Sequence, residues 1–196
     1  MRCLVTTALF FACMMHAQEI TITTGAQFTP NRNALDGAGV QRQISRTGPS
    51  GAAGVKFWLS SHSGLFAEAT FANTNTQLAD FARNTWTMNR VSIDAGYIYR
   101  LNRGRWAPYV KAGAGSMITI SGRAPGGPEV GLDCRMEEIA GPGVEYRLGR
   151  RFSFQAEYLA RFFRNPDFSD HGWHPERNVI SEPRIGIAYR LGYSPE

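Results

Sequence analysis

Four copies of one short pattern recur along the chain at nearly constant spacing. Each copy starts at a glycine, has an aromatic residue three positions later and ends in leucine after five; the glycines are Gly54, Gly96, Gly143 and Gly186. The intervals between them are 42, 47 and 43 residues, and a constant period indicates one structural unit used repeatedly. A β-hairpin followed by a long loop fits this length, so the repeat predicts eight strands in four pairs.

Apolar and polar residues alternate around each copy of the pattern, as side chains on the two faces of a strand do. Over 90–101, one face has Val91, Ile93, Ala95 and both tyrosines, whereas the other face has every charged residue. The same alternation predicts seven further strands, over 20–28, 53–60, 65–71, 106–115, 140–148, 152–162 and 184–191.

Alternation alone also fits a soluble β-sandwich, but strand length and aromatic placement favour a membrane barrel. About 9–11 residues cross a bilayer at a tilt, whereas strands of globular proteins are usually nearer 5–6 residues. Aromatic residues lie towards the strand ends, where an interfacial girdle needs them. These residues are Phe71, Tyr97, Tyr99, Trp106, Tyr146, Phe152, Tyr158 and Tyr189.

The predicted connections alternate in length. Tight turns are expected over 60–64, 102–105 and 149–151, and long loops over 30–50, 75–84, 120–135 and 164–178. Short turns at one end and long loops at the other are typical of outer-membrane barrels. The sequence therefore predicts a closed eight-stranded antiparallel up-and-down barrel, all-β, with its turns and both termini in the periplasm and its long loops outside the cell.

The first 17 residues read as a secretory signal peptide that is removed. Arg2 precedes an apolar run from Leu4 to Met15, and Ala17 is a small residue before a polar change. A lipoprotein anchor at Cys13 is an alternative, supported by Ala12 but not by the two phenylalanines before it. We expect a signal peptide over 1–17 and the barrel over 18–196.

Charge and cysteine content narrow the functional classes. The formal net charge is +5 and falls to +4 when Arg2 leaves with the signal peptide. The basic residues are scattered, which argues against nucleic-acid binding. Cys3 and Cys13 also leave, so Cys134 remains alone and no internal disulfide is possible.

The chain resembles the OmpA-like eight-stranded outer-membrane β-barrels of Gram-negative bacteria, the outer membrane protein beta-barrel domain family. The resemblance depends on the segment 106–115, on the repeated aromatic-Arg-Leu strand ends and on the last strand ending at 191–193. The final residues 194–196 differ from the terminal aromatic residue usual in the family. No peptidoglycan-binding domain follows, so no tether to the cell wall is implied.

Charged residues of both signs are expected to point into the barrel. They are Lys56, Glu68, Arg90, Asp94, Arg100, Lys111, Glu145, Arg147, Glu157, Arg161, Arg184 and Arg190. An eight-stranded barrel is just wide enough for side chains to fill it. We therefore expect a salt-bridged polar plug, with a narrow gated pore as the alternative; a wide porin needs about 16 strands.

Other chemistry-bearing residues are better explained by loop polarity. His171 and His174 near Asp170 could share a metal ion, but the segment is a predicted loop. Ser169, Asp170 and His171 are consecutive and cannot easily converge as nucleophile, base and orienting group. The Gly-Pro-rich segment 124–128 lacks the Lys-Ser/Thr of a phosphate-binding loop. His62 is expected to be solvated in a turn and Cys134 to be an inert thiol.

We conclude that the sequence predicts a non-enzymatic barrel in the outer membrane with a structural or adhesion-like role. The alternatives are a narrow pore, an enzyme acting on lipid A and a soluble periplasmic ligand-binding barrel. No catalytic residue, cofactor or metal ion is expected. The expected partners are outer-membrane lipid and lipopolysaccharide, and the barrel-assembly machinery during insertion. Nucleic acid is not a partner, and the protein is expected to be a monomer.

Overall fold

The computed structural model describes residues 18–29, 32–36, 39–45, 47–78, 85–121, 133–164 and 177–191. The predicted signal peptide, 1–17, lies outside these residues and stays a prediction. Ten antiparallel strands form one sheet: β1 Glu19–Gln27, β2 Arg32–Asp36, β3 Gly39–Ser45, β4 Gly48–Trp58, β5 Ser63–Leu78, β6 Thr85–Arg100, β7 Trp106–Ser121, β8 Asp133–Arg147, β9 Phe152–Arg164 and β10 Arg177–Arg190. Within the described residues, no helix is long and apolar enough to cross a membrane.

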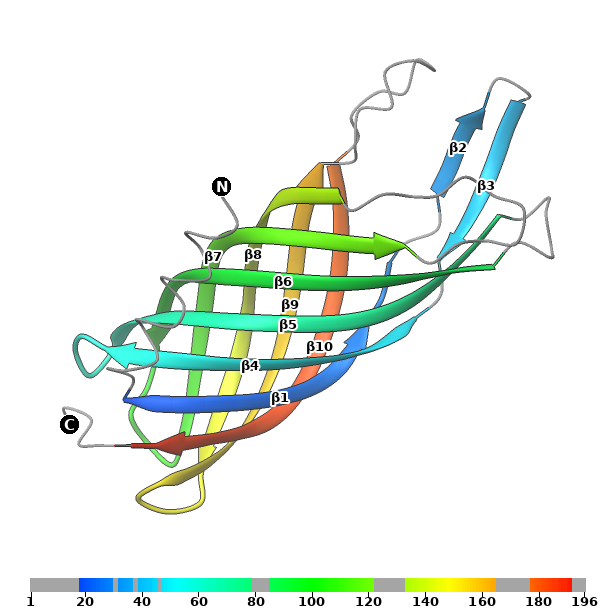
Figure 1. The fold of residues 1–196 in the computed structure, drawn as a ribbon. Coiled ribbons are helices and arrows are strands. Elements are labelled where there is room, and N and C mark those ends of the chain that lie inside the picture. Colours follow the sequence, from blue (N-terminus) through cyan, green and yellow to red (C-terminus); the bar gives the residue numbers. More distant parts are fainter. Residues whose placement is uncertain are drawn as a thin grey trace.

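Eight of the strands close into the predicted barrel (Figure 1). Their order is β5-β4-β1-β10-β9-β8-β7-β6, and pairing of β5 with β6 completes the ring. The first strand of the barrel therefore pairs with the last, from Glu19 opposite Arg190 to Gly25 opposite Arg184. Closure leaves no open edge in the barrel wall, as hydrocarbon requires.

The register of the pairs fixes the tilt and width of the barrel. The stagger of the barrel is the offset found after following paired residues once around the ring. Starting at Arg190 on β10 and its β1 partner Glu19, the path returns to β10 at Ile180. The stagger is therefore ten residues. Eight strands with this stagger tilt by about 40° and place the backbone about 8 Å from the axis. Each residue then advances about 2.5 Å along the axis.

The structure confirms the predicted assignment of faces. On β6, Arg90, Asp94 and Arg100 point inward and are at most 7% exposed, whereas Tyr97 and Tyr99 point outward and are more than 40% exposed. The outward side chains of the other strands are largely exposed as well. The strongly exposed ones include Ile22, Leu65, Phe71, Trp106, Val110, Phe152, Phe154, Tyr158, Ile185 and Ile187. Val55 and Ala67, which pair with each other on the outward face, are buried.

Three short connections join the strands at one end, which we call the turn side. They span 59–62, 101–105 and 148–151, and Leu59 and Leu148 each donate a backbone hydrogen bond across their turn. Aromatic rings gather beside them: Trp106 packs against Tyr146 with ring centroids 4.5 Å apart. Phe152 packs on Tyr189 at 5.0 Å. This group forms the turn-side aromatic girdle, and β1 begins and β10 ends at the same end (Figure 1).

At the opposite end, the loop side, the sequence prediction was wrong in two respects. The predicted loop over 30–50 contains the hairpin β2–β3, whose strand β3 pairs with β5 beyond the barrel (Figure 1). The strands also extend into the other predicted loops, since β5 reaches Leu78 and β8 begins at Asp133. The segment after Asn73 is polar at every position as far as Gln77, so alternation could not reveal a strand there.

The ladder between β8 and β9 is interrupted near its middle. Pairs run from Glu137 to Ala140 and resume at Gly143, so Gly141 and Pro142 are skipped. Proline has no N–H to donate to a ladder. Inside the wall, the Tyr109 ring packs over Gly143, where any Cβ would overlap it. The buried Tyr109 ring thus lies over the residue at which the ladder resumes.

Candidate functional site: the charged barrel interior

The inward faces of the eight strands carry nearly balanced charge. Among the described residues, the buried acids are Glu19, Glu68, Asp94, Glu137, Glu145, Glu157 and Glu182. The buried bases are Lys56, Arg90, Arg100, Lys111, Arg161 and Arg184. The Arg190 side chain, 12% exposed, adds a seventh base at the turn-side rim. Buried charge is tolerated only when it is paired, and all of these groups except Arg90 belong to three tiers along the axis or to the link between two of them.

The turn-side tier consists of Glu19, Lys56, Arg100, Glu145 and Arg190. The Glu145 carboxylate accepts from Arg100 Nη2 at 3.0 Å and from Arg190 Nη2 at 2.5 Å. Lys56 Nζ lies 3.1 Å from Glu19 Oε1. Five strands contribute to this tier, and its ion pairs join strands that are neighbours in the ring or have one strand between them.

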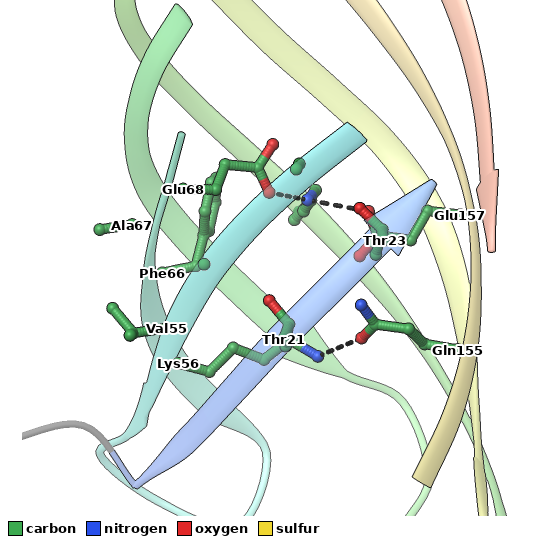
Figure 2. Close-up of a pocket in the computed structure, with 12 residues that line it drawn as sticks. Thr21, Thr23, Val55, Lys56, Phe66, Ala67, Glu68, Gln155 and Glu157 are labelled. Carbon is green, nitrogen blue, oxygen red and sulfur yellow. Dashed lines mark hydrogen bonds and ion pairs between the residues drawn. The ribbon is translucent and has the colours of Figure 1, made fainter. Parts of the chain in front are cut away.

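The middle tier consists of Glu68, Lys111 and Glu157, with the Tyr109 hydroxyl. Lys111 Nζ lies between the two carboxylates, 2.6 Å from Glu68 and 3.0 Å from Glu157 (Figure 2). The Tyr109 hydroxyl donates to the other oxygen of Glu157 at 2.5 Å. One amine therefore ties β5, β7 and β9 together across the lumen.

The loop-side tier is centred on Arg161, whose side chain is fully buried. Its guanidinium lies 2.7 Å from Asp94, 2.9 Å from Glu137 and 2.7 Å from Glu182. It also donates to the Thr70 hydroxyl at 2.9 Å. Arginine presents five N–H donors in a fixed planar fork, which suits one side chain to this set of surrounding acceptors.

Arg184 connects the middle and loop-side tiers. Its Nη1 donates to Glu68 at 2.9 Å and its Nη2 to Glu182 at 2.8 Å. Above the loop-side tier, Met117, Phe163 and Ile180 form a buried apolar cluster. The middle and loop-side tiers thus form one ionic network, with an apolar layer above it.

A small cavity lies between the turn-side and middle tiers. Its lining includes Thr21, Thr23, Lys56 and Gln155, and Lys56 donates across it to Gln155 at 2.9 Å (Figure 2). The free volume of about 10 Å³ accommodates roughly one water molecule. A hydrated ion or a sugar does not fit in this cavity.

The structure brings together most of the predicted inward charges. Ten of the twelve join the tiers as expected, from Lys56 on β4 to Arg190 on β10. Arg90 instead donates to Gln27 and Thr29, and Arg147 is half-buried at the turn-side rim. The sequence analysis missed Glu19, Glu137 and Glu182, although each continues the inward alternation of a predicted strand by one or more steps.

The other sequence candidates do not form a site in the described part of the chain. Residues 124–128 and 169–174 lie outside it, so the metal and hydrolase hypotheses for Ser169, Asp170, His171 and His174 are untested. No group of three His, Cys, Asp or Glu side chains in the described ranges could hold a metal ion. His62 lies in the first turn, stacked 6.2 Å from Tyr99, and the Cys134 thiol is exposed.

Comparison with known proteins identifies the family. A sequence profile described as "Outer membrane protein beta-barrel domain" matches residues 5–174. The chain belongs to this outer-membrane β-barrel family. Its place is therefore the outer membrane, and the soluble periplasmic barrel left open by the sequence is excluded. No curated protein sequence matches the chain.

Solved structures with the same fold agree with the family assignment. OprG of Pseudomonas aeruginosa is 12% identical, with a TM-score of 0.65 over 90% of this chain and 97% of that chain. Neisserial surface protein A, NspA, is 12% identical, with a TM-score of 0.53 over 88% and 97%. At these identities the likeness shows the fold alone.

Proposed function

We propose that the protein is a closed, non-enzymatic anchor that holds a β-sheet platform above the outer membrane for interaction at the cell surface. The platform consists of the loop-side ends of β5–β8 together with the hairpin β2–β3. Loops and strand ends on a rigid scaffold are where such proteins carry their variable binding functions. The observation that supports this role is the asymmetric length of the strands.

The platform extends well past the apolar stripe on the barrel wall. On β5 the last strongly exposed aromatic is Phe71, and the strand continues to Leu78. At about 2.5 Å per residue, this places the strand end about 17 Å beyond Phe71. On the turn side the strands end at the aromatic girdle itself, so only one end of the barrel is built to project. Lipopolysaccharide would surround the loop side, and the barrel-assembly machinery would insert the chain with its turns in the periplasm.

Removing the hairpin should reduce attachment without unfolding the barrel. We expect cells producing the full chain to adhere several-fold better to immobilised extracellular-matrix protein than cells without it. Replacing residues 31–46 by a short Gly-Ser linker should remove most of that gain. A mobility difference on a gel before and after boiling would show that the variant barrel is folded. Equal attachment of the folded variant and the full chain would contradict the role of the platform.

The packed interior predicts that the protein does not conduct ions. In planar bilayers, single-channel recordings should stay at baseline because three ionic tiers and an apolar layer block the lumen. Discrete openings would instead support the narrow pore.

The enzyme alternative is tested by mass spectrometry of lipid A. Lipid A from cells with and without the protein should have the same number of acyl chains.

A further inference from the structure

One acidic side chain lies on the outward wall of the barrel, away from the interior network. Glu138 on β8 is exposed and belongs to the outward set with Met136 and Ala140. It is opposite Ala114 of β7 and Phe162 of β9. Among outward strand residues whose side chains the structure describes, it is the only Asp, Glu, Lys or Arg.

Glu138 lies within the apolar band of the wall. It is eight residues along β8 from Tyr146 of the turn-side aromatic girdle, or about 20 Å along the axis. Since the apolar band of such barrels is about 25 Å tall, the carboxylate lies about 5 Å inside the loop-side boundary. Met136, 72% exposed, and Phe162 continue the apolar surface on its loop side.

The carboxylate has no partner within the described part of the chain, where no hydrogen bond or ion pair reaches it. Two hydroxyls lie on the same side of the barrel: Ser116 on β7 and Ser181 on β10 are outward and half-buried. Apart from Met136 and Phe162 on its loop side, the outward residues around it are small, namely Ala112, Ala114, Ala140, Pro142 and Ala160. The Ser116 hydroxyl donates to Met136 Sδ at 3.8 Å, so within the described residues this surface has a negative charge that no donor reaches. Hydrocarbon chains also offer no donor to such a group.

We propose that this surface, the Glu138 face, docks a transmembrane segment of a second membrane protein that presents a lysine or arginine to Glu138. Charge complementarity calls for a base, and the small side chains allow a segment to approach closely. A lipid amine is less suitable because headgroups lie above Met136 and Phe162. A second copy of this chain is less suitable because the described outward wall has no base. The inference is independent of the loop-side platform.

The test measures whether Glu138 selects a basic membrane segment. The probe is a synthetic Leu-Ala helix of about 20 residues with a single lysine placed about 5 Å inside the boundary, and the reference peptide has norleucine instead. Energy transfer to a dye on Cys134, with the other cysteines changed to serine, reports binding in phosphatidylcholine vesicles. We expect the lysine peptide to bind about tenfold more tightly than the reference, and Glu138→Gln to remove this preference.

Control variants and alternative occupants decide the outcome. Thr24→Val, on the distant outward face of β1, should leave the tenfold preference unchanged. Glu138→Gln should still fold by gel mobility, because removing a charge from the apolar wall does not hinder insertion. Equal binding of both peptides, or a preference that survives Glu138→Gln, would overturn the proposal. Glu138-dependent energy transfer between two copies would overturn it in favour of self-association. Loss of the preference on adding phosphatidylethanolamine would assign the site to a lipid amine.

Discussion

Replacing Arg161 with alanine should lower the free energy of unfolding by about 3–5 kcal/mol, the usual effect of removing one partner from a buried ionic group. The change leaves Asp94, Glu137 and Glu182 facing one another in the lumen, since Arg161 lies within 3 Å of all three. Urea unfolding of the protein refolded into vesicles, followed by tryptophan fluorescence, measures the loss.

Arg103→Ala is the matched control for this experiment. Arg103 has the same side chain but is exposed in the turn between β6 and β7, where an isolated charge contributes little. Its unfolding midpoint should move by no more than a small fraction of the Arg161→Ala shift. If the two variants lose the same stability, the loop-side tier does not support the barrel.

Placing arginine at Ala95 should impair insertion by about 2–4 kcal/mol, the effect of a base on the lipid face near the bilayer midplane. Ala95 is exposed and lies halfway between Tyr99 and Val91 along the outward face of β6. The outward residues paired with it are Ala67 and Ala114. Because Glu138 lies opposite Ala114, two strands away, this variant and its control are made in the Glu138→Gln background, where the described outward wall offers the new charge no acid. The folded fraction after dilution from urea into vesicles, read from gel mobility, gives the magnitude.

Leu101→Arg tests the dependence on depth. Leu101 is 59% exposed on the same outward face but at the turn-side end, where the effect should fall to about 0–1 kcal/mol. An Ala95→Arg variant that inserts as well as Leu101→Arg would mean that the exposed tyrosines and isoleucines do not face lipid.

Alternation was sufficient to predict the barrel because membrane and lumen impose opposite requirements on successive residues. Strands such as 152–162 follow that rule except at the inward Leu159, so their faces and inward charges could be read directly. The rule stops where both faces meet water. Residues 73–77 of β5 and the hairpin β2–β3 lie beyond the membrane, and there the sequence gives no period-two signal.

The ionic tiers were only partly predictable. The sequence identified inward charges strand by strand, but pairing across the lumen depends on stagger, and stagger depends on the register of all eight strands. Arg161 and Asp94 are 67 positions apart, and nothing local marks them as partners. Glu138 was missed for another reason: the predicted loop ended at residue 135 and the predicted strand began at Ala140, so this residue was assigned to neither and its outward position was not recognised.

The seam between β1 and β10 has a kinetic consequence. Glu19 pairs with Arg190, so the free edge of β1 has no hydrogen-bond partner until β10, the last strand of the barrel to be synthesised, is in place. Sheet growth from β4 through β9 can proceed by hairpins between neighbours, but sealing the cylinder requires a contact between the two most distant parts of the chain, and loop-closure entropy makes such contacts slow. Until then, both free margins can pair with foreign strands. Assembly of this protein is therefore most vulnerable to aggregation just before its final step.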